Sequence, residues 1–415
     1  MVTWFGEKVQ AIKLCCCAQL IDQPCTELRR RVWSPWQNSR PRLVNRGCEP
    51  ATASCLPIAT PIFPLFAMHA SHTSCSDVAA SDGPVTNGMA SPHRFASPLK
   101  QGRVQWQPGH VALVLGMHWL ALMALIPWLF SWTGVVLAVA GTYLFGMFGP
   151  IIGFHRLLTH RSFKCPKWLE YGMALVGVCC VQGSPIRWVT WHRMHHQHSD
   201  TAEDPHSPLV SFLWAHLEWM LTDDNNRSWF ASYDKYAPDM IRDRFYLALE
   251  RKGTWFFVYI AHTMLYFVIG FAVGWLRPGG TMMGGSQFGL SLLVWGAYVR
   301  TVLVWHITWS VNSFSHVSGY RNYETPDQSR NNWFVAVIAS GEGWHNNHHA
   351  EPNAASSGHC WWEFDPAYQM ILAMSSFGLV SDIMPVRGQR VRLYDGCYEQ
   401  RLDGDRTDAR RFEGD

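Results

Sequence analysis

Histidines occur at three places in the chain with spacings that suit metal binding. The segment HRLLTH places His155 and His160 five residues apart, and the segments HRMHH and HNNHH each contain an HxxHH pattern. On a helix, positions i, i+3 and i+4 share one face, so each HxxHH pattern is expected to present three imidazoles on one side. Neutral imidazole binds zinc, copper, iron and nickel. Together the segments supply enough ligands for two metal ions, namely His155, His160, His192, His195, His196, His345, His348 and His349.

The surrounding residues narrow the choice of metal. The zinc-hydrolase pattern HExxH is absent from the sequence. Two ExxH patterns, at 203–206 and 342–345, formally match those of carboxylate-bridged di-iron bundles. They contain Pro205 and Gly343, which are poor helix residues, so we give these patterns no role as metal ligands. A redox reaction next to a membrane favours iron.

Long apolar segments lie between the histidine segments. From Val104 to Phe154 the sequence contains no Asp, Glu, Lys or Arg, and about 20 apolar residues are enough to cross a bilayer. Two further apolar segments follow. The second carries Arg300 near its middle, where we expect the helix to reach the membrane surface and continue into water. The predicted spans are roughly 111–132, 134–154, 254–276 and 282–310.

The order of spans and histidines predicts a single site. Two crossings separate the early histidines from the late ones, so all of them return to the same face of the membrane. Only 16% of the residues are charged, against about 25% in typical soluble domains. The net charge of +3 and the absence of a basic stripe give no reason to expect a nucleic-acid partner. We predict an all-α membrane protein with four transmembrane helices in two hairpins and a helical cap on one face.

The two ends of the chain differ from the apolar part in composition. Residues 1–100 are rich in Ser, Thr, Ala, Pro, Cys and Arg, which is typical of a plastid transit peptide. The alternative is a disordered tail without a targeting role. We expect the membrane domain at 104–385 and a polar tail at 386–415.

The histidine segments and their neighbours closely resemble the membrane fatty acyl desaturases, and above all the Δ9-type acyl-lipid enzymes of cyanobacteria and plastids. The resemblance rests on HRLLTHRSF, HRMHHQHSDTAEDPHSP and GEGWHNNHHA. It is strengthened by KWLEY at 167–171, by NSFSHVSGYRNYET at 312–325 and by SRNNW at 329–333. It extends from about residue 105 to residue 385.

The resemblance implies a histidine-ligated di-iron site held on one face of the membrane by the helical cap. Eight of its nine histidines are those of the three segments. The ninth is His316, and Asn312, one helical turn earlier, holds an iron through a water molecule. The implied substrate-binding residues, which bend the acyl chain beside the irons, are Gln182, Trp188, Thr308 and Trp309. Trp188 and Trp309 could equally anchor the protein at the bilayer interface.

The reaction implied is an O2-dependent desaturation. It removes two hydrogens from adjacent methylenes of a saturated C16 or C18 acyl chain and leaves a cis double bond, at Δ9 or, on palmitoyl, at Δ7. Such C–H bonds are too strong for side-chain acids or bases, so we expect no catalytic residue beyond the di-iron centre. The cofactor carries the hard step and the protein positions the chain. We expect residues 141–147 to contribute to the depth of the pocket.

The residues before the second histidine segment bear on the form of the substrate. In the family that the chain resembles, the animal enzymes that act on acyl-CoA carry charged residues where this chain has Thr190 and Trp191, and Gly183 stands where a polar residue is expected. Because a polyphosphate group favours Arg or Lys, we expect an acyl chain bound to a glycerolipid or a carrier rather than to CoA.

The electron donor is expected to be a separate protein. A fused cytochrome b5 would show an HPGG-type haem motif, and RPGG at 277–280 lacks the histidine. In a chloroplast membrane the donor would be ferredoxin, and in the endoplasmic reticulum it would be cytochrome b5.

Two other classes of protein compete with a desaturase. A membrane di-iron hydroxylase or ketolase would use the same irons to insert oxygen into a lipid, but the Δ9-type flanking residues argue against it. A histidine-rich metal carrier or channel would need polar residues inside its spans, and these spans are nearly uncharged.

Overall fold

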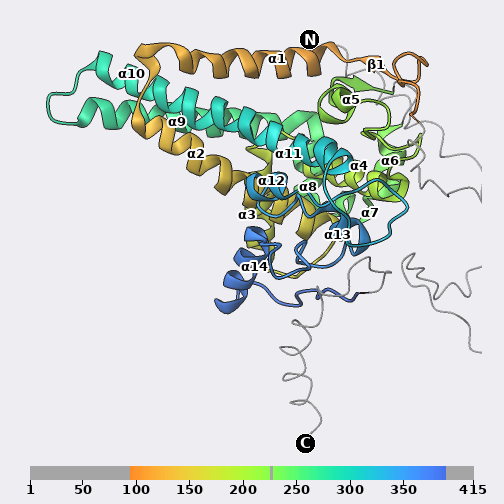
Figure 1. Cartoon of the computed structure of the whole chain (residues 1–415). Coiled ribbons are helices and arrows are strands. Elements are labelled where there is room, and N and C mark those ends of the chain that lie inside the picture. The colour runs from red at the N-terminus through yellow and green to blue at the C-terminus, as the bar shows by residue number, and fades with distance from the viewer. Residues whose placement is uncertain (1–93, 225–227, 389–415) are drawn as a thin grey trace, which may run out of the picture. The chain divides into compact units, whose positions relative to one another are not determined.

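The computed structural model describes residues 94–224 and 228–388. Residues 1–93 of the predicted transit peptide and residues 389–415 of the predicted tail lie outside the described residues. The described part is mainly helical (Figure 1). Within it, the short strands β1 (Gln105–Trp106) and β2 (Thr222–Asp223) form one antiparallel pair.

The first transmembrane hairpin follows the long uncharged run. Helix α1 (Pro108–Leu122) begins with a proline at its first turn, and the 3-10 turns η1 (Met123–Leu125) and η2 (Pro127–Leu129) lead away from it. Ser131 then caps α2 (Trp132–Gly146) by accepting a hydrogen bond from the amide of Gly134. Helix α2 continues as the π-helix η3 (Met147–Thr159).

The second hairpin consists of α9 (Thr254–Leu276) and a long helix built from α10 (Met282–Leu292), the π-helical η6 (Leu293–Val299) and α11 (Arg300–Val317). Its two arms approach closely because small residues face each other. A Cβ on Gly270 would lie 2.8 Å from the Cα of Gly289, as is common between membrane helices. Among residues 94–224 and 228–388, four helices are long and apolar enough to cross a membrane, which confirms the predicted two hairpins.

Arg300 lies among packed helices, and its predicted place near the membrane surface stays a prediction, because the 36-residue helix Met282–Val317 is longer than a bilayer is thick. The side chain is fully buried, and it lies inside the fourth candidate span, which runs from Met282 to Val317. Its guanidinium donates hydrogen bonds to the carbonyls of Gly296 and Cys179. Backbone carbonyls rather than water therefore accept two of the hydrogen bonds of this guanidinium.

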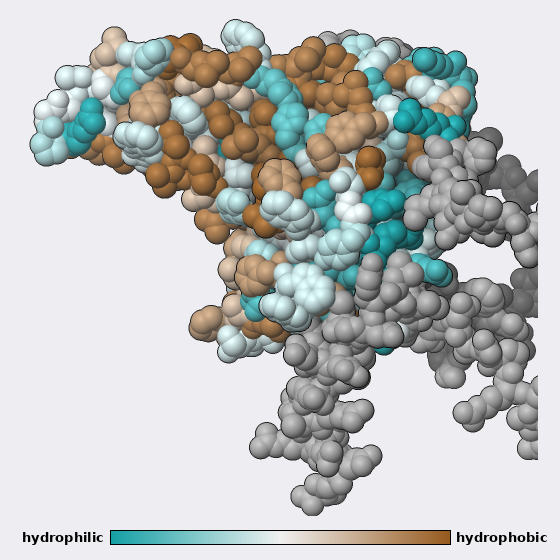
Figure 2. All heavy atoms as spheres, in the orientation of Figure 1, coloured by the Kyte–Doolittle hydropathy of each residue, from teal (hydrophilic) through white to brown (hydrophobic). Residues whose placement is uncertain are grey.

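The remaining helices form the cap. In Figure 1 the cap lies at one end of the transmembrane helices, so the histidines carried by these helices and by the cap reach the same side. Figure 2 shows apolar residues along the transmembrane helices and more hydrophilic residues over the cap. The cap elements are α3 (Lys167–Val178), α4 (Pro185–His198), α5 (Phe212–His216), η4 (Glu218–Leu221), α6 (Trp229–Tyr236), α7 (Pro238–Ile241), α8 (Arg244–Glu250), η5 (Arg251–Gly253), α12 (Trp333–Ile338), α13 (His345–Ala350) and α14 (Pro366–Ser376).

The core lies where the second transmembrane helix enters the cap. Ile152, Phe154 and Leu158 of η3 are fully or almost fully buried and belong to one apolar cluster with Ala174 of α3 and Ile371 of α14. This packing fixes the end of η3, and with it the first histidine segment, against the cap.

Candidate metal centre

The first histidine segment lies on a π-helix. We expected the second transmembrane helix to end before His155, but η3 continues to Thr159, so His155 is inside the helix and His160 follows its last residue. The amide of His160 donates to the carbonyl of His155 at 3.1 Å, which is the i to i+5 spacing of a π-turn. The wider turn allows both imidazoles to face the cap, where their ring centroids lie 4.7 Å apart.

The other two segments lie on short cap helices with well-defined starts. Ser184 caps α4 by accepting a hydrogen bond from the amide of Arg187, and Pro185 occupies the first turn. Helix α13 follows a turn in which Gly341 has φ +105°. A Cβ at Gly341 would collide with the Asp365 carboxylate. The structure therefore requires glycine at this turn.

Nine histidines gather into two groups. In each group the candidate ligand nitrogens lie within 4.8 Å of one another. Within the first group the Nε2 atoms of His155 and His348 are 3.0 Å apart, and within the second those of His316 and His345 are 3.1 Å apart. The first group is His155, His160, His192, His196 and His348, and the second is His195, His316, His345 and His349.

Each HxxHH pattern is divided between the two groups. We expected its three imidazoles to point the same way. Instead, the first and last histidines of a pattern join one group and the middle one joins the other, so that His192 and His196 are separated from His195. The two patterns divide in opposite senses, because His348 alone of its pattern joins the first group. The two groups are thus linked through both helices.

Four buried carboxylates support these histidines, and the sequence reasoning had given them no role. Each lies next to a histidine Nδ1, which favours the tautomer whose Nε2 lone pair faces the group. Asp200 and Asp204 come soon after the second histidine segment in the sequence. This closeness was the feature that could have indicated their role beside the histidines. The pairs are His155–Glu342 at 2.6 Å, His195–Asp204 at 3.0 Å, His316–Asp200 at 2.9 Å and His349–Asp327 at 2.9 Å.

Glu342 belongs to one of the ExxH patterns that were set aside. It is buried and pairs with His155 and with Arg156, whose Nη2 lies 2.8 Å from its Oε1. Burial raises the pKa of Glu342, but His155 and Arg156 outweigh it and lower the pKa to about 2. The carboxylate is therefore ionised and engaged with these partners.

The electrostatics of the two groups suit a bound cation. Burial, reinforced by neighbouring imidazoles, lowers the pKa of His160, His192, His196, His345 and His348 well below the usual value. These rings are neutral at pH 7 and keep their lone pairs. The Nε2 atom of His160 is buried without a hydrogen-bond partner among the described residues. Clustered neutral nitrogens that face one another fit a transition-metal ion of the kind that imidazole prefers.

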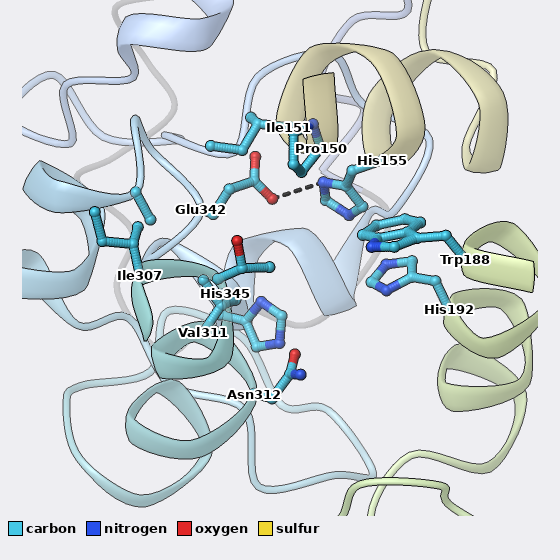
Figure 3. Close-up of a pocket in the computed structure, with 12 residues that line it drawn as sticks. Pro150, Ile151, His155, Trp188, His192, Ile307, Val311, Asn312, Glu342 and His345 are labelled. Carbon is cyan, nitrogen blue, oxygen red and sulfur yellow. Dashed lines mark ion pairs between the residues drawn. The ribbon is translucent and has the colours of Figure 1, made fainter. Parts of the chain in front are cut away.

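A cavity beside the histidines brings several predicted site residues together. Figure 3 shows His155, His192, His345 and Asn312 around this central cavity. Asn312 faces the cavity one turn before His316 on α11. The predicted water-mediated ligand is thus beside both groups without being a member of either.

The four predicted substrate-binding residues also meet. The Gln182 amide donates to the Thr308 hydroxyl at 2.9 Å, and Trp188 Nε1 donates to the Gln182 carbonyl oxygen at 3.0 Å. The Trp188 ring stacks on the His192 ring with centroids 5.0 Å apart. Trp309 is buried and lines, with the other three, a second cavity that adjoins the central one.

Two more cavities adjoin this pair, one next to the central cavity and one next to the second cavity. An inner cavity shares Ile151, Ile307 and Thr308 with the central one and is bordered by Tyr143 and Met147. An outer cavity shares Gln182, Trp191, Met220 and Trp309 with the second cavity. It is bordered by His110, Arg187 and Trp255. His110 and Trp255 lie at the first turns of α1 and α9, so the outer cavity lies at the cap side of the membrane.

The fold and the site together define a helical membrane protein with a candidate metal centre on one face. The sequence model of the fatty acid desaturase family matches residues 131–381. The chain is 39% identical over 298 residues to the sn-2 palmitoyl-lipid 9-desaturase of Nostoc sp. (strain 36), covering 72% of this chain and 95% of that protein. It is 41% identical over 286 residues to the chloroplastic palmitoyl-monogalactosyldiacylglycerol delta-7 desaturase of Arabidopsis thaliana, covering 69% and 71%.

An acyl-CoA 5-desaturase of Anemone leveillei is 40% identical over 274 residues, covering 66% of this chain and 78% of that protein. The chain therefore belongs to the fatty acid desaturase family. It is an oxidoreductase that desaturates a fatty acyl chain.

Proposed function

We propose that the two histidine groups bind two iron ions, the first through five histidines and the second through four, with Asn312 contributing through a water molecule. The observation that carries this proposal is the division of nine histidines, seven of them buried, into two groups, with four histidines supported by carboxylates. When bound, the iron pair supplies the O2-derived oxidising power that unactivated methylene C–H bonds require. The chain itself supplies orientation, burial and the acyl path.

The acyl chain lies along the series of adjoining cavities. Its carbonyl end is in the outer cavity, at the cap-side ends of α1 and α9, where lipid headgroups would lie. Its methyl end is in the inner cavity beside Tyr143 and Met147, deeper along α2. Between them the chain passes Gln182, Trp188, Thr308 and Trp309, where the path turns beside the histidines. Apolar walls exclude water from this stretch, so the shape of the path selects the carbons that react.

The substrate is a saturated C16 or C18 chain carried on a glycerolipid, and the product is a cis Δ9 or Δ7 double bond. Two relatives are named for palmitoyl-lipid substrates. Thr190 is fully buried in this structure, so it offers nothing to a CoA polyphosphate at the membrane surface. Purified enzyme should desaturate membrane lipid at least ten-fold faster than stearoyl-CoA, where ten-fold corresponds to about 1.4 kcal/mol in the barrier. Equal rates on the two substrates would contradict the lipid-bound form.

The electrons come from a separate protein. In a chloroplast membrane this is ferredoxin, and the chloroplastic relative supports that location. Turnover supported only by NADH and cytochrome b5 would instead place the enzyme in the endoplasmic reticulum.

The decisive experiment expresses the full chain in a host that lacks its own desaturase. Double-bond positions in the host lipids are mapped by mass spectrometry, and iron is measured in the purified protein. We expect two irons per chain and monounsaturated C16 or C18 chains with the bond at Δ9 or Δ7. A protein that desaturates with zinc or with a single iron would contradict the proposed centre.

A further inference from the structure

Arg300 is a buried charge that the metal centre and the acyl path do not account for. Its partners are the carbonyls of Gly296 and Cys179, the hydroxyl of Thr301 and the imidazole of His262. The guanidinium also lies 4.2 Å from the centre of the Phe145 ring. None of these partners carries a full negative charge. Its Nη1 atom is buried without a hydrogen-bond partner in the described part of the chain.

Stability alone does not explain such a residue. Removing an arginine from water is costly unless a counter-ion and full hydrogen bonding compensate it. An ionisable residue inside a membrane span is therefore expected to serve function. The surrounding packing accommodates it specifically, since a Cβ on Gly141 would lie 2.9 Å from the Arg300 Cδ.

The contacts of Arg300 lead to the turn between α3 and α4. Its Nη2 donates to the carbonyl of Cys179, directly after the last residue of α3, at 2.9 Å. A helix C-terminus carries unpaired carbonyls and partial negative charge, so a guanidinium is a suitable partner there. Five residues further along α11, Trp305 Nε1 donates to the carbonyl of Cys180 at 2.8 Å. Three residues beyond it, Thr308 accepts from Gln182.

The turn that these contacts hold has a strained backbone. Val181 has φ +54°, a conformation that β-branched residues avoid, and Gly183 has φ +88°. Strain of this kind persists only where the surroundings over-determine the backbone, and it concentrates at functional sites. Val181 and Gln182 both line the outer cavity, and Gln182 also lines the second cavity. The strained turn is thus part of the wall of the acyl path.

From this geometry we infer that Arg300 and Trp305 are positioning residues for the double bond. They hold the 180–183 turn against α11 and so set where Gln182 meets Thr308 at the bend of the acyl path. This inference rests on the proposed function, because it requires that the acyl chain passes Gln182. When either contact is lost, the bend shifts along the chain and desaturation occurs at neighbouring carbons.

The test is the distribution of double-bond positions produced by the full-length enzyme in a desaturase-deficient host. Trp305→Phe keeps an aromatic ring but removes the indole N–H donated to the Cys180 carbonyl, together with part of the ring that lines the outer cavity. We expect the share of product with the bond away from the main position to rise about five-fold, the ratio expected for loss of one buried hydrogen bond. Arg300→Gln should shift the distribution further, and Arg300→Lys should lie between Arg300→Gln and the parent enzyme.

Trp295→Phe is the matched control. Trp295 lies on η6, in the same long helix, and its Nε1 donates to the carbonyl of Leu129 at 3.1 Å, in the connection between α1 and α2. This variant loses the same kind of bond at a place away from the four cavities, and it should keep the parent distribution. The readout is a ratio within the product, so a lower amount of folded enzyme does not change it.

The outcomes distinguish failure of this inference from failure of the proposed function. An unchanged distribution in Trp305→Phe, or an equal shift in Trp295→Phe, would overturn the positioning role. Gln182→Ala tests the acyl path itself. If Gln182→Ala shifts the bond and Trp305→Phe does not, only the inference fails. If neither variant shifts it, the proposed path past Gln182 fails as well.

Discussion

At the residue scale, the chemistry depends on histidine nitrogens held in one tautomer. A carboxylate at Nδ1 accepts the ring proton and leaves the Nε2 lone pair for a metal. Burial raises the pKa of Asp327, but the facing His349 outweighs it and lowers the pKa far below the usual value. The carboxylate is therefore ionised at neutral pH.

Asp327→Ala tests this support. The substitution removes the acceptor for His349 Nδ1, 2.9 Å away, without removing any proposed ligand. We expect iron affinity or activity to fall by about 10- to 100-fold, as for other supporting residues of metal sites. Metal analysis of the purified protein checks it. Asp234→Ala, at an exposed cap position, is the control and should keep full iron content, and equal iron in both variants would contradict the role.

A second residue-scale prediction concerns pH. Burial raises the pKa of Asp239, but Arg193 and Arg161 outweigh it and lower the pKa from 3.8 to about 2. A depressed pKa means that the folded state favours the ionised form. This stabilising contribution is complete above pH 3.8 and is lost as the pH falls through about 2.

Asp239→Asn should therefore lower the melting temperature at pH 7 by a few degrees, about the shift expected for 1 kcal/mol in a chain of this size, and make little difference near pH 2. Thermal unfolding in detergent at the two pH values measures it. Asp382→Asn removes an exposed pair with Lys164 and should change the melting temperature by less than about 1 °C. Equal effects of the two variants would show that the half-buried Asp239 pair has no special role.

At the scale of elements, short helices and turns place the ligands. Gly341→Ala would introduce a Cβ against Asp365 at a residue with φ +105°. We expect α13 to shift and carry His345, His348 and His349 out of register, with loss of bound iron. Gly172→Ala is the matched control, because it lies inside α3 with no atom within 4 Å of the added Cβ. Because alanine has a greater helix propensity than glycine, Gly172→Ala should leave stability unchanged or improved. Full iron content in Gly341→Ala would contradict the argument.

At the scale of the whole described unit, the two hairpins put the cap on one side of the membrane. The connections at 126–131 and 277–281 should therefore lie on the opposite side. In sealed vesicles, a cysteine at exposed Arg277 and one at exposed Lys235 of the cap should react with a membrane-impermeant maleimide from opposite sides. The parent chain gives the background labelling. Labelling of both from one side would rule out the two-hairpin topology.

The sequence by itself determined the spans, the common face of the histidines and the family, because these depend on local composition and spacing. An uncharged run of sufficient length dictates a membrane helix whatever surrounds it.

Only the tertiary structure decided how the imidazoles are shared. One helix face can serve two neighbouring centres, so the HxxHH spacing alone does not say that His195 separates from His192 and His196. The carboxylate partners also come from distant parts of the chain, as with Asp327 beside His349 and Glu342 beside His155. The surroundings of Arg300 were likewise decided by the tertiary structure. The sequence shows a charge in an apolar run, but helix packing brings the carbonyls of Cys179 and Gly296 to its guanidinium.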